Sequence, residues 1–238
     1  MSLLELRNVS KRHTGGGRNV TVLRDGFLEI DPGELVGVYG PRGSGRTSLL
    51  RLVAGIDPPD SGTVCFDGRD LAKHGEEILG REIGYCEKSF RTAVGPTAID
   101  EVIDGLLVNG VRRAEARTRA HEALQRVSGE NIAHRRMSEL DSAERIRLAL
   151  AQALTLQPRL LVVDEPVAGV NLDQRDEILY LLRSLADEGT AMLMTLGDLG
   201  ELRGADQSLT IGDGELRGSG KRRLQPVADL TLRRQASG

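Results

Sequence analysis

The sequence predicts an α/β protein with a mainly parallel sheet, a small antiparallel β subdomain and an inserted helical subdomain. Short apolar runs at residues 35–39, 160–163 and 191–195 have the length and composition of buried strands. Helical segments separate these runs, a pattern that favours parallel strands joined by right-handed crossovers. Between the first two runs, residues 97–156 carry apolar residues at helical spacing, which predicts the inserted subdomain.

The N-terminal part predicts the antiparallel strands. Apolar and polar residues alternate at residues 4–7, 20–23 and 27–30, and residues 13–17 are expected to form a flexible turn. Further along, residues 58–62 predict a turn into a strand at 63–66, which Asp67-Gly68 ends. Residues 82–86 predict one more short strand.

A glycine-rich segment follows the apolar run at residues 35–39 and precedes a predicted helix at 49–54. It matches the phosphate-binding pattern G-x-x-x-x-G-K-[ST] except that an arginine stands at the lysine position. Glycines let backbone N–H groups approach a phosphate, and the helix N-terminus adds roughly half a positive charge. The residues expected to bind the nucleotide here are Gly40, Pro41, Arg42, Gly43, Ser44, Gly45, Arg46, Thr47 and Ser48. The Thr47 hydroxyl is also expected to bind Mg²⁺.

Arg46 leaves the competence of this loop open. A guanidinium carries the same charge as an ammonium but is larger and planar, and it prefers two-pronged contacts. Arg46 is therefore either a working substitute for lysine or a mark of weakened catalysis. Drift is a third explanation, because lysine is scarce in this chain.

The second half of the candidate site follows the apolar run at residues 160–163. The strand ends in Asp164 and Glu165, which places both carboxylates at the carboxyl edge of the sheet beside the phosphate loop. We expect Asp164 to bind Mg²⁺ and Glu165 to act as the general base. An Asp-Glu pair alone could equally be two solvated carboxylates; the upstream glycine loop favours the functional interpretation.

The remaining segments complete the expected fold. Within the helical subdomain, Ile99, Val102, Ile103, Leu106 and Leu107 lie on one predicted helical face, and further helices are expected at 112–127 and 143–156. A helix at 176–185 and a β segment at 208–216 follow. The basic tail, residues 218–238, is expected to be either solvated or in contact with a partner or lipid headgroups.

Composition and charge argue against a general nucleic-acid binder, a secreted protein and a membrane-spanning protein. Apolar residues at 39% and charged residues at 28% are ordinary for a globular protein, and a net charge of -3 gives no general attraction to nucleic acid. We expect neither a secretory leader nor a membrane span. Cys65 and Cys86 are expected to be buried free thiols, which fits a cytoplasmic protein.

Together these motifs resemble the ATP-binding subunit of an ABC transporter. Residues 40–48 resemble its Walker A loop, residues 160–166 its Walker B strand and residues 165–171 its D-loop. The resemblance covers nearly all of residues 3–217. It implies a P-loop NTPase core, ATP and Mg²⁺ as ligands, and a nucleotide-binding domain at 1–217 with its helical subdomain at roughly 89–156.

The same resemblance implies partners. Such subunits dimerise head-to-tail, with ATP between one chain's Walker A loop and the other's signature motif. They work with a separate transmembrane permease subunit at the inner face of the cell membrane. A nucleic-acid partner is not expected.

The chain also departs from the family pattern. The signature L-S-G-G-Q aligns with residues 140–144, where Asp141 replaces the serine and both glycines are lost. Leu196 stands at the switch-histidine position and Lys88 at the Q-loop glutamine. His13 aligns with the aromatic platform for adenine. Lys88 is either a compensating charge or a solvent-facing lysine, and His13 is either a small stacking surface or a histidine without a role.

From these features we expect a chain that binds ATP-Mg and couples dimer closure to the membrane subunit as the catalytically degenerate half of a heterodimer. The alternatives are a competent ATPase in which Arg46 and Lys88 compensate, and a non-hydrolysing regulatory or structural protein of the same fold.

Overall fold

The computed structural model describes residues 2–15, 18–87, 95–202 and 204–219. Its framework is a six-stranded sheet, whose outer hairpin strand β10 is antiparallel to β9 while the remaining neighbours are parallel. In spatial order the strands are β10 (Glu215–Ser219), β9 (Gln207–Gly212), β3 (Leu35–Tyr39), β8 (Ala191–Leu196), β7 (Leu160–Asp164) and β6 (Ile83–Cys86). The predicted α/β class with a mainly parallel sheet is confirmed.

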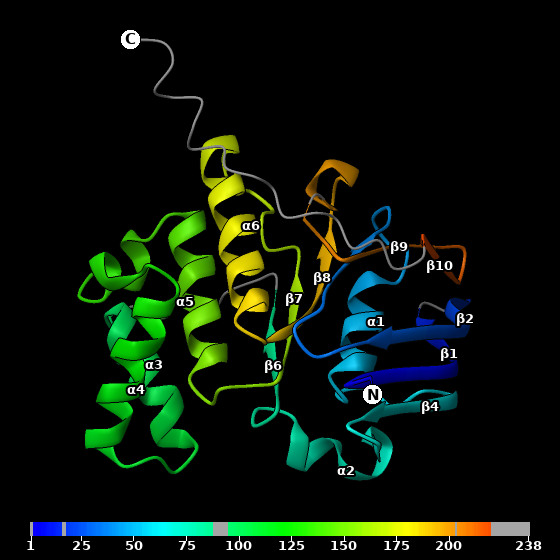
Figure 1. Cartoon of the computed structure of the whole chain (residues 1–238), viewed down its shortest axis with the longest axis horizontal. Coiled ribbons are helices and arrows are strands. Elements are labelled where there is room, and N and C mark those ends of the chain that lie inside the picture. Colours follow the sequence, from blue (N-terminus) through cyan, green and yellow to red (C-terminus); the bar gives the residue numbers. More distant parts are fainter. Residues whose placement is uncertain (1, 16–17, 88–94, 203, 220–238) are drawn as a thin grey trace.

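A second, antiparallel sheet lies beside the first (Figure 1). Its strands, in spatial order, are β2 (Arg18–Ile30), β1 (Leu4–Gly15), β4 (Ser61–Phe66) and β5 (Arg69–Asp70). The strands predicted at 20–23 and 27–30 are parts of the single strand β2. The pairing of β1 with β2 shifts register after Leu6. This irregular pairing lets β2 continue through the residues between the two predicted runs, where apolar and polar residues do not alternate. The turn predicted at 13–17 is wrong for residues 13–15, which continue β1 and pair with β2, while residues 16–17 lie outside the described residues.

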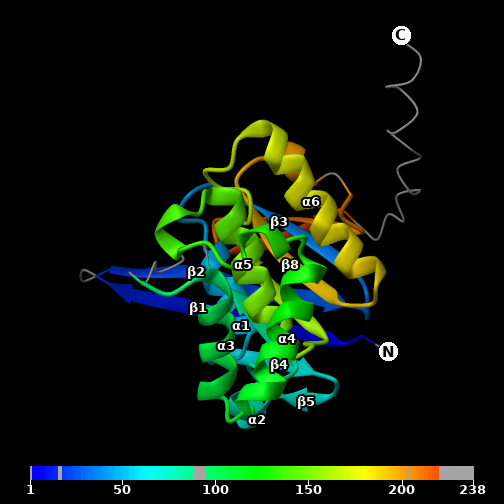
Figure 2. The same cartoon turned by 90° about the vertical axis from the view of Figure 1, so that its left-hand side faces the viewer.

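Helices fill the space between the strands and cover the sheet. They are α1 (Arg46–Val53), α2 (Leu71–Ile78), α3 (Ala98–Val108), α4 (Arg113–Arg126), α5 (Ser142–Leu154) and α6 (Leu172–Asp187). Short 3₁₀ turns occur at Glu130–Ile132 (η1), Met137–Glu139 (η2) and Leu199–Leu202 (η3). Figure 2 shows α3, α4 and α5 gathered on one side of the molecule.

Helix boundaries differ from the sequence expectation where polar caps lie outside the apolar pattern. Helix α6 begins at Leu172 rather than 176 because Asn171 caps it, its side chain accepting from Gln174 N. Helix α2 was not predicted at all. It is short and mostly polar, and the Asp70 side chain caps it by accepting from Ala72 N.

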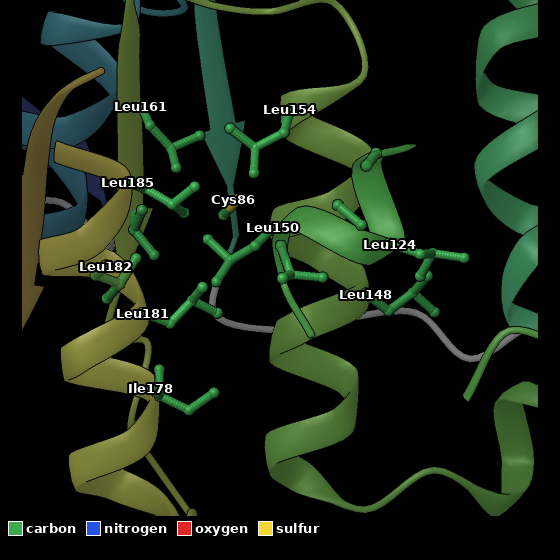
Figure 3. Close-up of a cluster of buried hydrophobic side chains, with 14 of the residues drawn as sticks. Cys86, Leu124, Leu148, Leu150, Leu154, Leu161, Ile178, Leu181, Leu182 and Leu185 are labelled. Carbon is green, nitrogen blue, oxygen red and sulfur yellow. The ribbon is translucent and has the colours of Figure 1, made fainter. Parts of the chain in front are cut away.

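The larger hydrophobic core joins the helical region to the sheet. On α3, Ile99, Val102, Ile103 and Leu106 are buried as predicted, while Leu107 is only partly buried. Figure 3 shows the middle of this core, where α5 and α6 face β6 and β7. Its labelled side chains are Cys86, Leu124, Leu148, Leu150, Leu154, Leu161, Ile178, Leu181, Leu182 and Leu185. This packing fixes α5 and α6 against each other and against the strand that ends in Asp164.

Both cysteines are free thiols, as expected, but only Cys86 is fully buried, whereas Cys65 is half-buried. Among the described helices, none combines the length and the apolar character that crossing a bilayer requires.

Candidate functional site

The phosphate loop runs from the end of β3 to the start of α1 and depends on glycine at both ends. A side chain at Gly40 would collide with Ser44 Oγ and bring its Cβ within 2.5 Å of the Ile211 carbonyl oxygen. Gly45, the N-cap of α1, has φ of 103° and would place a Cβ 2.8 Å from the Val22 carbonyl oxygen. The loop backbone therefore passes through spaces that other residues would fill.

This loop suits a phosphate ligand. The first turn of α1 directs its backbone N–H groups toward the loop, where an anion is favoured. Ser44 Oγ is buried and has no hydrogen-bond partner among the described residues. A buried hydroxyl left in this way costs about 1–3 kcal/mol until a ligand or water satisfies it. The residues present thus fit a bound triphosphate.

An oxygen cluster joins α1 to the ends of β7 and β8. The Thr47 hydroxyl donates to Asp164 Oδ2 at 2.9 Å, and the Thr195 hydroxyl donates to Asp164 Oδ1 at 2.6 Å. Asp164 is 5% exposed. Hydroxyl and carboxylate oxygens are the donors that Mg²⁺ prefers. The structure therefore brings together the two residues predicted to bind this metal.

Thr195 is a site residue that the sequence analysis did not identify. It pairs directly with Asp164 across the parallel strands β7 and β8, and its hydroxyl also accepts from Glu165 N at 3.1 Å. The register of two predicted strands would have been the signal that locates it. Beside this cluster, burial and then the charge of Asp164 raise the pKa of Tyr85, so its phenol stays protonated.

Arg46 crosses the site to the opposite strand ends. Its guanidinium forms an ion pair with Glu165, and Nη1 donates to the Leu196 carbonyl oxygen at 2.5 Å. Both side chains of the pair are mostly buried, with exposures of 11% for Arg46 and 12% for Glu165. Glu165 itself has φ of 46°, in the left-handed region. The candidate general base is thus held by the residue that replaces lysine.

The other predicted binding residues lie around the rim. His13 is exposed, with Nε2 at 2.9 Å from Ser48 Oγ, which places it beside the first turn of α1. Pro41, Arg42 and Gly43 form the exposed outer part of the loop. Lys88 lies outside the described residues.

The signature position forms the N-terminus of α5. Asp141 Oδ1 accepts from Glu144 N at 2.8 Å, while Glu144 Oε2 accepts from Asp141 N at 3.0 Å, which is a capping box. Gln174 Nε2, from α6, donates to Asp141 Oδ2 at 3.1 Å. Burial raises the pKa of Asp141, but these hydrogen bonds outweigh it and the net pKa is lowered.

The capping box changes how the acidic residues at this position are understood. By its position in the signature motif, Asp141 replaces a ligand-contacting serine, whereas in the structure its carboxylate caps a helix. Glu144 also forms an ion pair with Arg135. The pattern D-x-x-E before an apolar helix was visible in the sequence and would have identified the cap.

Comparison with known proteins gives consistent matches. Residues 23–168 match the family model described as ABC transporter. The chain is 32% identical over 218 residues to the Bacillus subtilis (strain 168) protein named "Uncharacterized ABC transporter ATP-binding protein YvrO", covering 90% of this chain and 95% of that protein.

Solved structures of ATP-binding cassettes have the same fold. The cassette MJ0796 in a dimeric, post-hydrolysis state bound to ADP and Pi superposes with a TM-score of 0.82 at 26% identity, covering 93% of this chain and 100% of that one. Another dimeric structure of MJ0796 gives a TM-score of 0.80 with the same identity and coverage. With the glycine loop, the Asp164 cluster and these matches in agreement, the chain belongs to the ABC transporter family as an ATP-binding subunit.

Proposed function

We propose that this chain binds ATP with Mg²⁺ and couples dimer closure to a separate membrane subunit, as the catalytically degenerate half of a heterodimer. The contact between Arg46 and Glu165 is the observation that carries the proposal. A general base must be free to accept a proton from an attacking water. Glu165 is instead paired with a guanidinium that also engages the Leu196 carbonyl.

The chain's own residues divide the work of binding. The loop at residues 40–48 would hold the phosphates through backbone N–H groups, and Thr47 with Asp164 would hold Mg²⁺. Bound Mg²⁺ would supply positive charge to the β- and γ-phosphates. Thr195 orients Asp164 from behind, because its hydroxyl donates to the carboxylate oxygen that Thr47 does not use.

Leu196, at the switch-histidine position, is a second reason to expect slow ATP hydrolysis. A leucine side chain cannot donate to a γ-phosphate or relay a proton, and Leu196 is fully buried. Only its backbone carbonyl reaches the site, where Arg46 engages it. Slow hydrolysis is therefore expected even with ATP bound.

The signature position supports the proposed heterodimer. ABC ATP-binding domains dimerise and partner with transmembrane subunits. In a homodimer, Asp141 and its capping box would stand opposite both phosphate loops, and two like charges about 4 Å apart cost on the order of 1 kcal/mol in water and about 4 kcal/mol near a protein surface. A partner with an intact signature would complete the site over this chain's own loop.

We also propose bounds for the domains of the chain and a location for its assembly. The nucleotide-binding domain would comprise residues 1–219, because β10 continues to Ser219 instead of ending at the predicted boundary of 217; the helical subdomain would lie at roughly 89–156, and the remaining residues would be the basic tail. The assembly would lie peripherally on the cytoplasmic face of the membrane. Purification from membranes is expected to recover a non-identical ATP-binding chain together with a permease chain. Recovery of a permease complex with two copies of this chain would overturn the heterodimer.

The direct test is ATP turnover by the purified full chain with Mg²⁺. We expect turnover well below the range of about 1–10³ per second that is typical of enzymes. Millimolar ATP should nevertheless raise the melting temperature, because a ligand that binds the folded state stabilises it. Absence of any thermal shift would favour a regulatory or structural protein that does not bind nucleotide.

A competent ATPase is the second candidate, and the cluster of Thr47, Asp164 and Thr195 favours it, because the metal-binding half of the site is complete. Turnover within the enzyme range that Glu165→Gln abolishes would establish this candidate. Turnover that Glu165→Gln leaves unchanged would indicate a contaminating ATPase.

A further inference from the structure

A buried acidic residue lies just beyond the switch position. Glu201, in η3, is 7% exposed, and its Oε2 accepts from the backbone N–H groups of Gly197 at 3.1 Å and Asp198 at 3.3 Å. Its other oxygen forms an ion pair with Arg175 of α6 at 3.1 Å. A buried charge persists only when it is paired and hydrogen-bonded. Glu201 therefore fixes the loop after β8 to helix α6.

This loop also contacts the phosphate site. Gly197 directly follows Leu196, whose carbonyl oxygen accepts from Arg46 at 2.5 Å. On its other side, η3 packs closely on β3, where a Cβ at Gly37 would be 2.5 Å from Leu202 Cδ2. The segment that carries the Leu196 carbonyl is thus held between β3 and α6.

The first turn of α6 in turn contacts the start of α5. Gln174, the residue before Arg175, donates to the Asp141 carboxylate at 3.1 Å. Asn171 orients Gln174, since its Nδ2 donates to Gln174 Oε1 at 2.6 Å and its Oδ1 accepts from Gln174 N at 2.9 Å. Helices α5 and α6 lie side by side (Figure 1), packed through the shared core.

We propose that these contacts form a mechanical relay from Arg46 to the N-terminus of α5, with Glu201 as its positioning residue. The path runs through the Leu196 carbonyl, Glu201, Arg175 and then Gln174 to Asp141. When Arg46 leaves the Leu196 carbonyl, the loop loses one of its restraints, and the ion pair of Glu201 transmits the change to α6. The relay requires no switch histidine and no hydrolysis, so it goes beyond the proposed function.

Hydrogen exchange on the ligand-free full chain tests the relay. The reporters are the amides of Glu144 and Arg145, which donate to Asp141 Oδ1 at 2.8 Å and to the Asp141 carbonyl at 3.0 Å. Arg46→Ala is expected to change their protection by about fivefold or more, the lower end of common coupling strengths. Glu201→Gln should abolish this response, as should Gln174→Ala.

Asp206→Asn provides the matched control. Asp206 also accepts from a backbone N–H, that of Leu35 at 2.8 Å, and also pairs with an arginine of α6, Arg183 at 2.7 Å. It lies outside the path, so the response to Arg46→Ala should persist in the Asp206→Asn background. A merely structural loss of packing would affect both backgrounds alike.

Two outcomes would overturn the relay. One is an Arg46→Ala change confined to residues near the phosphate loop, with α5 protection unaltered. The other is additivity, in which Glu201→Gln and Arg46→Ala act on α5 independently. If Glu201→Gln fails to fold, the Gln174→Ala change at a partly buried position gives the same test, because it removes the last contact in the path.

Discussion

The N-termini of α1 and α5 differ in what their backbone N–H groups bind: α1 has no side-chain cap, whereas α5 is capped by Asp141. Helix α1 begins after Gly45, which has no side chain with which to cap it, so its N–H groups remain available to a phosphate. Helix α5 begins after Asp141, whose carboxylate already accepts from the helix. An anionic ligand and a capping carboxylate compete for the same donors. The start of α1 thus has N–H groups open to a ligand, whereas the start of α5 is capped by its own side chain.

The largest effect is expected from adding a side chain at Gly40, where the phosphate loop packs closely against Ser44 and Ile211. Gly40→Ala should abolish the thermal shift with Mg-ATP and destabilise the fold by about 1–3 kcal/mol, because the new methyl meets backbone at Ile211. Thermal unfolding with and without Mg-ATP measures both effects.

Gly43→Ala is the matched control for this change. A Cβ at Gly43 meets nothing within 4 Å among the described residues, although its φ of 82° disfavours a side chain by about 1–2 kcal/mol. Nucleotide binding should survive there. Equal loss of binding in both variants would mean that the tight packing at Gly40 has no special importance.

A smaller effect is expected from restoring catalytic groups one at a time. A lysine cannot bridge Glu165 and the Leu196 carbonyl as a guanidinium does, so Arg46→Lys should free Glu165. We expect ATP turnover to rise by about tenfold to a hundredfold, which is at or below the usual contribution of a general base. Leu196→His alone should change turnover by less than about threefold, because Arg46 would still be paired with Glu165. Steady-state ATPase assays compare the two. A large gain from Leu196→His alone would show that the pairing of Arg46 with Glu165 does not limit turnover.

Changing the second helix start should alter stability only slightly. Asp141→Ser keeps an N-cap oxygen while removing a charge, so the free energy of unfolding should fall by less than about 1 kcal/mol. Asp141→Ala removes the cap and should cost about 0.5–2 kcal/mol. Urea unfolding of the two variants ranks them. A serine variant no more stable than the alanine variant would show that the cap depends on charge rather than on an acceptor.

The smallest expected effect is the contribution of Asp141 to the stability of the fold at acidic pH. The pKa of Asp141 is lower in the folded chain than in the unfolded one, so the folded state binds this proton more weakly. Its stabilisation is present above the unfolded pKa of about 3.9 and is lost as pH falls through the folded pKa. Because Asp141 is exposed, solvent screening limits this to a few tenths of a kcal/mol, on the order of a surface ion pair. Stability measured against pH should fall less steeply in acid for Asp141→Asn than for the natural chain.

The sequence predicted the parts of the site that depend on local pattern. Residues 40–48 and the strand ending in Asp164 were identified because glycine spacing and apolar runs act over short distances. The contact of Arg46 with Glu165 joins residues 119 positions apart and depends on side-chain direction, which periodicity does not encode. Thr195 required the register of β7 with β8.

Some local features were nevertheless missed. Helix α2 spans only eight residues, so a helical repeat had little length in which to show, and the cap at Asp70 was the clearer signal. The capping box of Asp141 and Glu144 is encoded locally as D-x-x-E, although the same residues depart from the family's signature motif. A departure from a family motif can itself be a standard structural element.

The two natural thiols give this chain a practical advantage for spectroscopy. Burial raises the pKa of Cys86 to about 12 and is also the main cause that raises the pKa of Cys65, so both remain protonated near neutral pH. A thiolate is the form that alkylating dyes attack. A cysteine introduced at Val108, which is 88% exposed at the end of α3, should therefore accept a fluorophore selectively. Domain movements could then be followed optically without removing either native sulfhydryl.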